Sequence, residues 1–456
     1  MKRVNSILLL LLVSLIFSCT NSQSKITYAN TVTTFKQYVG EYVYEAIGVT
    51  ISIYTKAEEN DNQLYFFLTG EGEFELIAIG EHQFSLGGEE EFKVEFKNSE
   101  NGVFNELFLI QPQGTVKAVR KEKAEIRIDD LATIDENLTA RGFSGVVLVA
   151  QNDSILFNKA YGRKNSQENG LNDINTVFSI CSITKQFTAA GILKLSMQNK
   201  VSLDDKLSKY FPTVPDDKKN ITIHQLLTHS SGLVGEIGDD YDAITEAAFL
   251  NQVFSSELIN PVGTAFNYSN VGYSLLTLII EKVSEMDYET FLNAAIFKPS
   301  KMNHTGYVIP NWGTNEVANG YSEGAEAKKP NEENWSEQGP YLNLKGNGGI
   351  LSSASDMLLW SQAIRDHTVL DEATTSNYLY PHFEYNDGRA NYGYGWWIEN
   401  NDLDNKLVRH DGGGNLFVSD LWMYPKKEIT IIVLSNTQDI YALSIARKIS
   451  NFLLAE

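Results

Sequence analysis

Residues 178–187, with the sequence FSICSITKQF, place a hydroxyl and an amine at a spacing that permits catalysis. Ser182 and Lys185 are three residues apart, so on a helix their side chains share one face, with about 5–6 Å between the Cβ atoms. A serine hydroxyl is a poor nucleophile until a base removes its proton, and a lysine can be that base only if burial or a neighbouring positive charge lowers its pKa. A helix that begins near Ser182 also leaves the Ser182 N–H without an intrahelical partner, where it can donate to an oxyanion. One turn is therefore predicted to supply a nucleophile, a base and an oxyanion donor.

Other reactive side chains receive structural interpretations. On a helix, Cys181 points about a third of a turn away from Ser182, so we interpret it as a small, inert, buried residue. His224 and His229 flank Leu-Leu-Thr at a predicted helix end, where capping and packing explain them. The chain has seven histidines and no H-x-x-x-H pair, so we expect neither a metal nor another cofactor. The glycines at 412–414 lack the Lys-Ser/Thr of a phosphate-binding loop, and close approach to a strand explains them better.

Two later segments carry further candidates. FNYSNVGYSLL at 266–276 supplies Tyr268 and Asn270 in a loop ahead of a predicted helix. HDGGGNLFVSDLWMYP at 410–425 supplies His410 and a glycine run that leads into a predicted strand. The three segments together contain S-x-x-K, Y-x-N and H-x-G, in that order along the chain.

This order resembles the three-part signature of the serine β-lactamase and D-Ala-D-Ala carboxypeptidase superfamily, whose third motif is [K/H]-x-G. The resemblance covers roughly 130–456. It extends to the connecting segments ITIHQLLTHSSGL (221–233), PVGTAFNYSN (261–270), GNGGILSSASDML (346–358) and YGYGWW (392–397). The resemblance implies a class C-like, penicillin-binding-protein-like serine hydrolase.

The resemblance also implies roles for individual residues. Ser182 is similar to the acylated nucleophile, Lys185 to its basic neighbour, and Tyr268 to the phenol that moves a proton between nucleophile and leaving group. Asn270 would hold Lys185 and the substrate amide by hydrogen bonds.

The third motif is expected to form the strand that lines the site. Gly412 would remove a side chain so that the substrate backbone can lie along the strand, and the Gly413 N–H would be the second oxyanion donor. His410 stands where lactamases carry a lysine that suits a substrate carboxylate. A histidine is only partly charged at pH 7 unless a carboxylate raises its pKa, and Asp411 is adjacent. Family members with histidine here tend to be D-peptidases or esterases.

The leading hypothesis is a serine hydrolase that works through an acyl-enzyme on D-amino-acid peptides or small esters and amides. Its type would be a D-Ala-D-Ala carboxypeptidase, a D-aminopeptidase or an esterase. One alternative is a β-lactamase, whose substrate is a β-lactam. The other is a non-catalytic lipoprotein that binds penicillin or peptidoglycan.

The elements that must position these residues form two parts. Residues 25–125 alternate apolar and polar side chains in short runs separated by Gly, Asn or Asp, which predicts a small all-β domain similar to a lipocalin-like barrel. A charged stretch at 120–130 is the expected link. Residues 130–456 begin with a short amphipathic helix (131–141) and a hairpin that turns at Asn152-Asp153, continue through helices and end in three strands and a helix. This pattern predicts an α+β, β-lactamase-like domain with an antiparallel sheet, flanking helices and an inserted helical part.

The N-terminus and the charge bear on location and partners. Residues 1–19 combine Lys2 and Arg3 with a short apolar run, as in a secretory signal, and Ile16-Phe17-Ser18-Cys19 resembles a bacterial lipobox. We expect an exported lipoprotein anchored in a membrane through Cys19, on the periplasmic or cell-surface side. The net charge of −21 argues against nucleic acid as a partner.

Overall fold

The computed structural model describes most of the chain and divides it into two compact units between residues 126 and 127. The residues described are 35–44, 49–54, 63–68, 72–100, 102–112, 114–120, 131–152, 154–167, 170–313, 316–322, 324–385, 390–399, 406–414, 416–437 and 441–454. Residues 1–34, with the predicted signal and Cys19, lie outside this set, as do 121–130 of the predicted link. None of the described helices is both long and apolar enough to cross a membrane.

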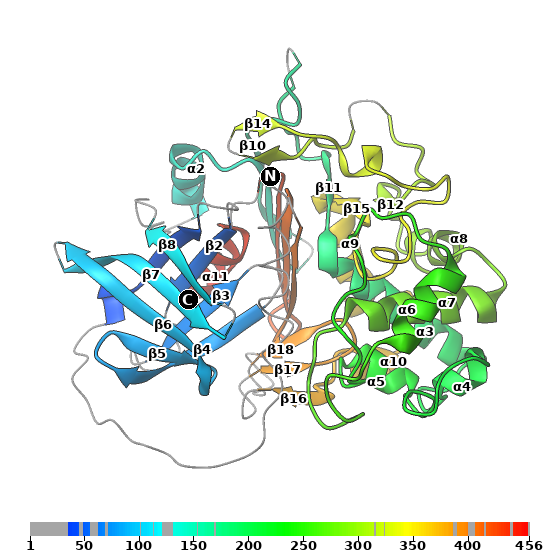
Figure 1. Ribbon diagram of the computed structural model, residues 1–456. Helices are drawn as coiled ribbons and strands as arrows, with labels where there is room; N and C mark the ends of the chain where they lie inside the picture. The colour runs from blue at the N-terminus through cyan, green and yellow to red at the C-terminus, as the bar shows by residue number, and fades with distance from the viewer. Residues whose placement is uncertain are drawn as a thin grey trace. The chain divides into compact units, whose positions relative to one another are not determined.

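The first unit is a closed barrel in which consecutive strands pair antiparallel and β1 closes on β8. A 3-10 turn, η1 (Phe35–Gln37), precedes the strands. The strands, coloured blue to cyan in Figure 1, are β1 (Gly40–Tyr44), β2 (Val49–Tyr54), β3 (Leu64–Leu68), β4 (Gly72–Gly80), β5 (Gln83–Leu86), β6 (Glu89–Glu100), β7 (Val103–Gln111) and β8 (Gly114–Arg120). The predicted all-β barrel is confirmed.

Aromatic side chains fill the inside of the barrel. The Tyr38 ring stacks on Phe104 with 5.1 Å between centroids and lies 4.8 Å from Phe96. The Arg120 side chain donates hydrogen bonds to the Val39 carbonyl at 2.6 Å and to the Tyr42 hydroxyl at 2.8 Å. Alternation along the strands explains this arrangement, because every second residue of a strand points inward.

The second unit is built on an eight-stranded antiparallel sheet with the order β10-β9-β21-β20-β19-β18-β17-β16. Strands from both ends of the unit therefore pair in its middle, as predicted. The strands are β9 (Gly145–Gln151), β10 (Ser154–Tyr161), β16 (Phe383–Tyr385), β17 (Ala390–Tyr392), β18 (Trp397–Glu399), β19 (Leu407–Gly413), β20 (Val418–Tyr424) and β21 (Ile429–Ser435). Two small sheets join β11 (Val177–Ser179), β15 (Leu351–Ser353) and β12 (Thr305–Gly306), and β13 (Tyr321–Ser322) with β14 (Ala325–Glu326).

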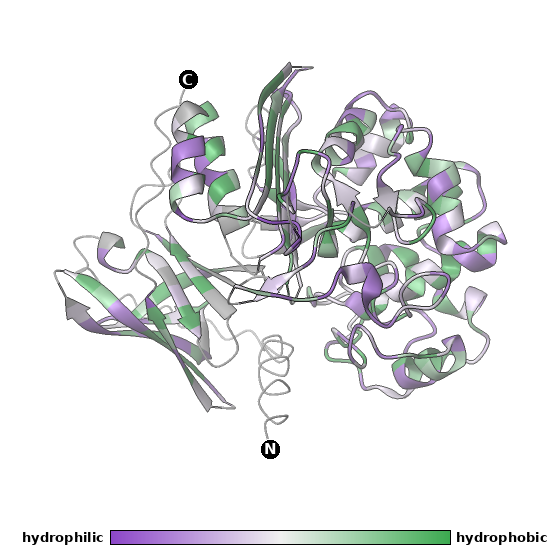
Figure 2. Ribbon diagram, turned by 90° about the horizontal axis from the view of Figure 1, so that it is seen from above, coloured by the Kyte–Doolittle hydropathy of each residue, from purple (hydrophilic) through white to green (hydrophobic). Residues whose placement is uncertain are grey.

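Helices cover both faces of the large sheet (Figure 1). The residues of β20 and β21 are all buried, which explains why both strands are largely apolar and do not alternate strictly, as the green strands of the central sheet in Figure 2 show. On one face lies α11 (Tyr441–Leu454), with Ile445 and Ile449 fully buried. The other α-helices are α2 (Leu131–Ala140), α3 (Thr184–Met197), α4 (Leu207–Tyr210), α5 (Ile223–Leu227), α6 (Glu246–Ser255), α7 (Asn270–Ser284), α8 (Tyr288–Leu292), α9 (Ala354–Arg365) and α10 (Glu372–Tyr378). Short turns are η2 (Cys181–Ile183), η3 (Asn293–Phe297) and η4 (Pro330–Glu332).

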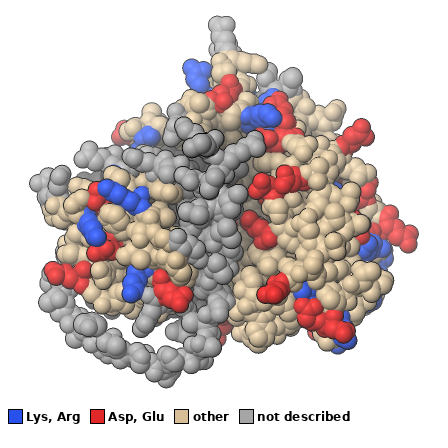
Figure 3. Space-filling view, in the orientation of Figure 1, with Lys and Arg blue, Asp and Glu red and all other residues tan. Residues whose placement is uncertain are grey.

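The predicted α+β class is confirmed, with helices α3 to α8 gathered on the face of the sheet opposite α11. The surface of this unit carries scattered acidic side chains on the face seen in Figure 3 and no broad basic patch there. That distribution agrees with a chain of 58 acidic and 37 basic residues.

Candidate active site

The start of α3 brings Ser182 and Lys185 together. The chain leaves β11, makes the single turn η2 and continues as α3, so the two residues lie one turn apart. The Lys185 side chain is fully buried, whereas Ser182 keeps partial contact with solvent. The Lys185 Nζ donates to the Ser182 Oγ at 3.3 Å and to the Asn347 carbonyl at 2.8 Å. The amine is therefore held at the hydroxyl, in reach of its proton.

The turn that presents Ser182 is strained and tightly packed. Cys181 has a φ of +47°, in the left-handed region that side-chain-bearing residues seldom adopt. Its thiol lies 3.6 Å from the Phe417 carbonyl, and Ser419 on β20 donates to the Ile180 carbonyl at 2.7 Å. Burial raises the pKa of Cys181 to about 12, so the thiol stays protonated and inert, as its interpretation required.

Burial also determines the state of the base. It lowers the pKa of Lys185 to about 7, although the carboxylates of Glu236 and Asp240 act in the opposite direction. A large fraction of Lys185 is therefore neutral near pH 7. In that form it can accept the proton of Ser182.

The Tyr268 ring lies over this amine, with 4.7 Å between the Lys185 Nζ and the ring centroid. The same ring also packs on the buried His229, at 4.2 Å between ring centroids. The His229 Nδ1 accepts a hydrogen bond from the Ser269 N–H at 3.0 Å, and burial holds the pKa of His229 well below its usual range. His229 is thus a neutral packing residue that supports both the ring and the backbone of the Tyr268 segment.

Asn270 differs from its expected role. It is the first residue of α7, and its Nδ2 donates to the Glu236 Oε1 at 3.0 Å. The hydrogen bond to Lys185 that the sequence predicts does not occur among the described residues, because the Asn347 carbonyl takes that place. Asn347 is in turn fixed through its Nδ2, which donates to the Ser274 hydroxyl at 2.9 Å. The Asn270 Oδ1 is buried without a partner among the described residues, and its hydrogen bond to a substrate amide stays a prediction.

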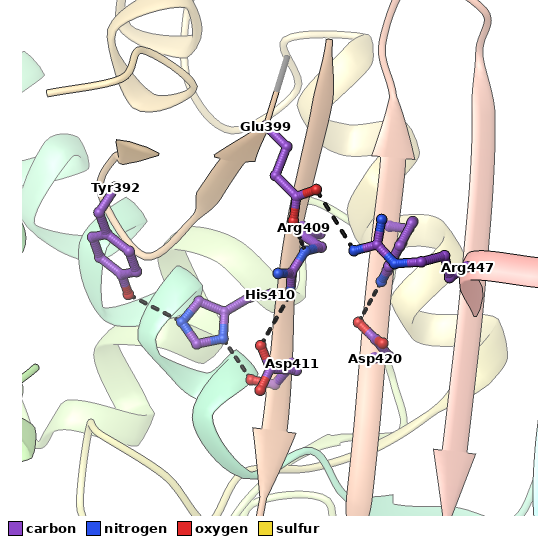
Figure 4. Close-up of polar contacts among 8 residues, drawn as sticks. Tyr392, Glu399, Arg409, His410, Asp411, Asp420 and Arg447 are labelled. Atoms are coloured by element: carbon purple, nitrogen blue, oxygen red, sulfur yellow. Dashed lines mark hydrogen bonds and ion pairs between the residues drawn. The ribbon is translucent and has the colours of Figure 1, made fainter. Parts of the chain in front are cut away.

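His410 is neutral and fully engaged (Figure 4). Its Nδ1 donates to the Asp411 carbonyl at 2.5 Å, so its Nε2 accepts from the Tyr392 hydroxyl at 3.0 Å. Burial lowers the pKa of His410 to about 4, and the opposing effect of Asp411 is smaller. The expectation that Asp411 could keep this histidine charged is therefore wrong. Neighbouring residues of a strand point to opposite faces, and the Asp411 carboxylate pairs with Arg409 on the other side.

A buried ion network fixes this second face of β19 (Figure 4). Arg409 donates to Glu399 on β18 at 2.5 Å and to Asp411 at 3.2 Å, and Arg447 of α11 lies 3.6 Å from Glu399. The Trp422 indole donates to Asp420 at 2.7 Å. The network ties together β18, β19 and α11, and so holds the strand that carries His410.

Removing Arg409 should expose the strength of this network. Arg409→Met leaves Glu399 and Asp411 without their shared cation in a buried site, and we expect a loss of about 3–5 kcal/mol in the free energy of unfolding. Calorimetry of the full chain measures it. Lys159→Met removes an exposed partner of Asp135 and should cost less than about 1 kcal/mol. Equal losses of unfolding free energy in Arg409→Met and Lys159→Met would contradict a stabilising role of the buried network.

Packing within the protein requires a glycine at position 412. A Cβ at this position would lie 2.3 Å from the Ser419 Oγ and 2.4 Å from the Ile180 carbonyl oxygen. The missing side chain therefore lets β19 pack on the turn before Ser182, rather than making room for substrate as expected. The close approach sets the distance between the nucleophile and the strand.

The backbone of Gly413 is oriented as an oxyanion donor requires. The Gly414 N–H donates to the Phe417 carbonyl at 3.0 Å. Because N–H groups alternate in direction along an antiparallel ladder, the Gly413 N–H points away from β20. On that side β18 pairs with β19 only as far as Arg409. The Gly413 N–H is therefore directed to an edge of β19 that β18 does not cover.

Sequence reasoning missed several residues of the site. They are Asn347, Glu236 and Asp240. The segment GNGGIL around Asn347 resembles a connecting segment of the family, and that resemblance gives Asn347 no role. The loop GEIGDDYD at 235–242 is dense in carboxylates, and that density is the signal that points to Glu236 and Asp240.

Together, the fold and the arrangement of serine, lysine and tyrosine define a serine hydrolase with a β-lactamase-like scaffold. The chain belongs to the family described as Beta-lactamase, whose model matches residues 131–453. It is 29% identical over 327 residues to penicillin-binding protein 4* of Bacillus subtilis, an alignment that covers 68% of this chain and 72% of the relative.

Solved structures show the same fold. The octameric penicillin-binding protein homologue from Pyrococcus abyssi matches with a TM-score of 0.61 and 26% identity, over 71% of this chain and 76% of the other. A class C β-lactamase from Rhodobacter sphaeroides also has a TM-score of 0.61, over 71% of this chain and 98% of its own. At 17% identity the latter supports the fold alone.

Proposed function

We propose that this hydrolase forms an acyl-enzyme on Ser182 with D-amino-acid peptides or small esters and amides, which water then releases. The observation that carries the proposal is the Lys185 Nζ, held 3.3 Å from the Ser182 Oγ with its pKa lowered to about 7. A neutral amine at this distance removes the hydroxyl proton as the oxygen attacks the substrate carbonyl.

The remaining groups complete the reaction. The N–H groups of Ser182 and Gly413 would donate to the oxyanion of the tetrahedral intermediate. Tyr268, whose ring lies over Lys185, would pass the proton from the lysine to the leaving group. In the second half of the cycle the same residues would take a proton from water and return it to the Ser182 oxygen as the acyl bond breaks.

The state of His410 favours peptidase or esterase chemistry over β-lactam hydrolysis. A neutral histidine whose two ring nitrogens are occupied offers no cation for the carboxylate of a β-lactam or of a C-terminal D-alanine. Among the types considered, D-aminopeptidase and esterase activity therefore suit the site better than carboxypeptidase or β-lactamase activity.

Covalent labelling tests the proposal. We expect a fluorophosphonate probe to add one adduct, which mass spectrometry of the digested protein locates on Ser182. Nitrophenyl esters and short D-peptides should be turned over, whereas a chromogenic cephalosporin should be hydrolysed slowly. Fast cephalosporin turnover would instead make the protein a β-lactamase. If the protein retained penicillin but turned over none of the substrates, it would be a binding protein. An adduct on another residue would rule out Ser182 as the nucleophile.

A further inference from the structure

The loop at 235–242 places two carboxylates beside the site and is attached to the Tyr268 segment. Glu236 accepts a hydrogen bond from Asn270, two residues after Tyr268, at 3.0 Å. The backbone N–H of Asn270 donates to the Gly235 carbonyl at 2.8 Å. The negative charges of Glu236 and Asp240 both act to raise the pKa of Lys185, against the larger effect of burial. The loop is thus part of the surroundings of the reacting groups.

Neither carboxylate is neutralised by a direct ion pair. Glu236 and Asp240 both remain accessible to solvent, and neither forms an ion pair within 4.0 Å in the described part of the chain. Burial, and to a lesser extent the negative charge of Glu236, raise the pKa of Asp240 to about 7, so the two carboxylates lie close enough to repel each other. A bound cation would relieve this repulsion.

A second, independent feature is a buried acceptor without a donor. The Asn343 side chain is only 9% exposed, and its Nδ2 donates to the Asp239 carbonyl on the same loop at 2.9 Å. Its Oδ1 has no partner among the described residues, and neither has the Oδ1 of Asn270. Buried polar atoms are seldom left unpaired in a native protein. The loop and its neighbours therefore offer two carboxylates and two unpaired amide oxygens as acceptors, whereas the side-chain amide donors of Asn270 and Asn343 are already engaged.

We propose that Glu236 and Asp240 select substrates with an ammonium group close to the scissile carbonyl. This inference rests on the proposed acyl-enzyme chemistry at Ser182 and specifies in addition the charge that the preferred substrate carries. An ammonium carries three donors and no acceptor, which matches the surplus of acceptors here. With His410 neutral, the site has carboxylates for a cation and no strand cation for an anion, so a free amine is preferred over a free carboxylate.

Three substrates that differ only in charge test the proposal. D-alanine p-nitroanilide with a free amine, its N-acetyl form and its N-succinyl form share the scissile bond and the leaving group. For the unmodified protein at pH 7 we expect kcat/KM to be at least about 10-fold higher for the free amine than for the N-acetyl form, and lowest for the N-succinyl form.

Glu236→Gln with Asp240→Asn should bring the ratio of free amine to N-acetyl close to one, mainly by raising KM for the free amine. The ratio cancels any change in the reactivity of Ser182, because all three substrates use the same nucleophile. Asp216→Asn with Glu257→Gln removes two exposed carboxylates elsewhere and should leave the ratio unchanged. A preference for the acetylated or succinylated substrate, or an unchanged ratio in the first double variant, would overturn the proposal.

A binding measurement keeps the test decisive if anilides turn over slowly. D-alaninamide and N-acetyl-D-alaninamide should protect Ser182 from the fluorophosphonate probe, the former at a concentration at least about 10-fold lower. Labelling of Ser182 with equal protection by both amides would defeat the charge preference alone. Absence of labelling at Ser182 would instead defeat the proposed acyl-enzyme.

Discussion

Replacing Ser182 by alanine is expected to lower kcat/KM for ester and D-peptide substrates by about 10⁴-fold or more, because the atom that forms the acyl bond is lost. Among the described residues, the hydrogen bond lost with the hydroxyl is the one from Lys185, whose amine keeps the Asn347 carbonyl as a partner. Stability should therefore change by no more than about 0.5 kcal/mol. Steady-state kinetics and thermal unfolding of both proteins measure the two effects.

The neighbouring thiol should not replace the lost hydroxyl. Burial raises the pKa of Cys181 to about 12, so almost no thiolate exists near pH 7. Ser196→Ala, near the other end of α3, is the matched control and should retain full activity. If Ser182→Ala kept more than a hundredth of the activity, or if iodoacetamide inactivated the unmodified protein, the nucleophile would have to be sought elsewhere.

Replacing Lys185 by methionine is expected to lower kcat/KM by about 10²–10⁴-fold, the usual contribution of a general base. In the unmodified protein the base is the neutral amine, so kcat/KM should rise with pH through a midpoint at about 7, the lowered pKa of Lys185. The variant should lose this rise. Lys194→Met, which removes another lysine of α3, should keep both the activity and the pH profile.

Stability should respond to pH with a defined sign. Between about 7 and the ordinary value of 10.5, Lys185 is neutral in the folded protein but protonated in the unfolded chain. The unfolded state then binds more protons, so the free energy of unfolding of the normal protein falls as pH decreases through this window. Lys185→Met removes this dependence, and its melting temperature relative to the normal protein should rise as pH falls from 10.5 to 7. A constant difference would show that Lys185 keeps its ordinary pKa.

The parts of the site set by local geometry were predictable from sequence. The i, i+3 spacing of Ser182 and Lys185 requires only a helix, and the apolar residues after them predict one. Tyr268 is distant in sequence, and its place at Lys185 followed from the resemblance of the Y-x-N segment rather than from any local pattern. The hairpin at Asn152 follows from the pattern of apolar residues on either side of a turn. The sheet completed by the last strands follows from the order of predicted strands and helices along the chain.

Long-range packing explains what could not be predicted. The Asn347 group that binds Lys185 is a backbone carbonyl, which every residue possesses, so no side-chain pattern marks it. The neutrality of His410 depends on burial under Tyr392 and outweighs the adjacent Asp411. The need for glycine at 412 arises from Ile180 and Ser419, which only the fold brings near. Asn347 is far from Lys185 in the chain, and Ile180 is far from Gly412, so no local pattern marks these contacts.

The filled interior of the N-terminal barrel limits which ligands this unit can bind. Eight strands leave room either for packed side chains or for one small ligand. In the described part of the barrel the rings of Tyr38, which precedes β1, and of Phe96 and Phe104 occupy that room, and Arg120 donates a hydrogen bond to the Val39 carbonyl. A long apolar ligand, such as a fatty acid, would have to displace these close-packed rings. From the described residues we therefore expect recognition by this unit to use the outer faces of its strands, which suits a macromolecule better than a small molecule held inside.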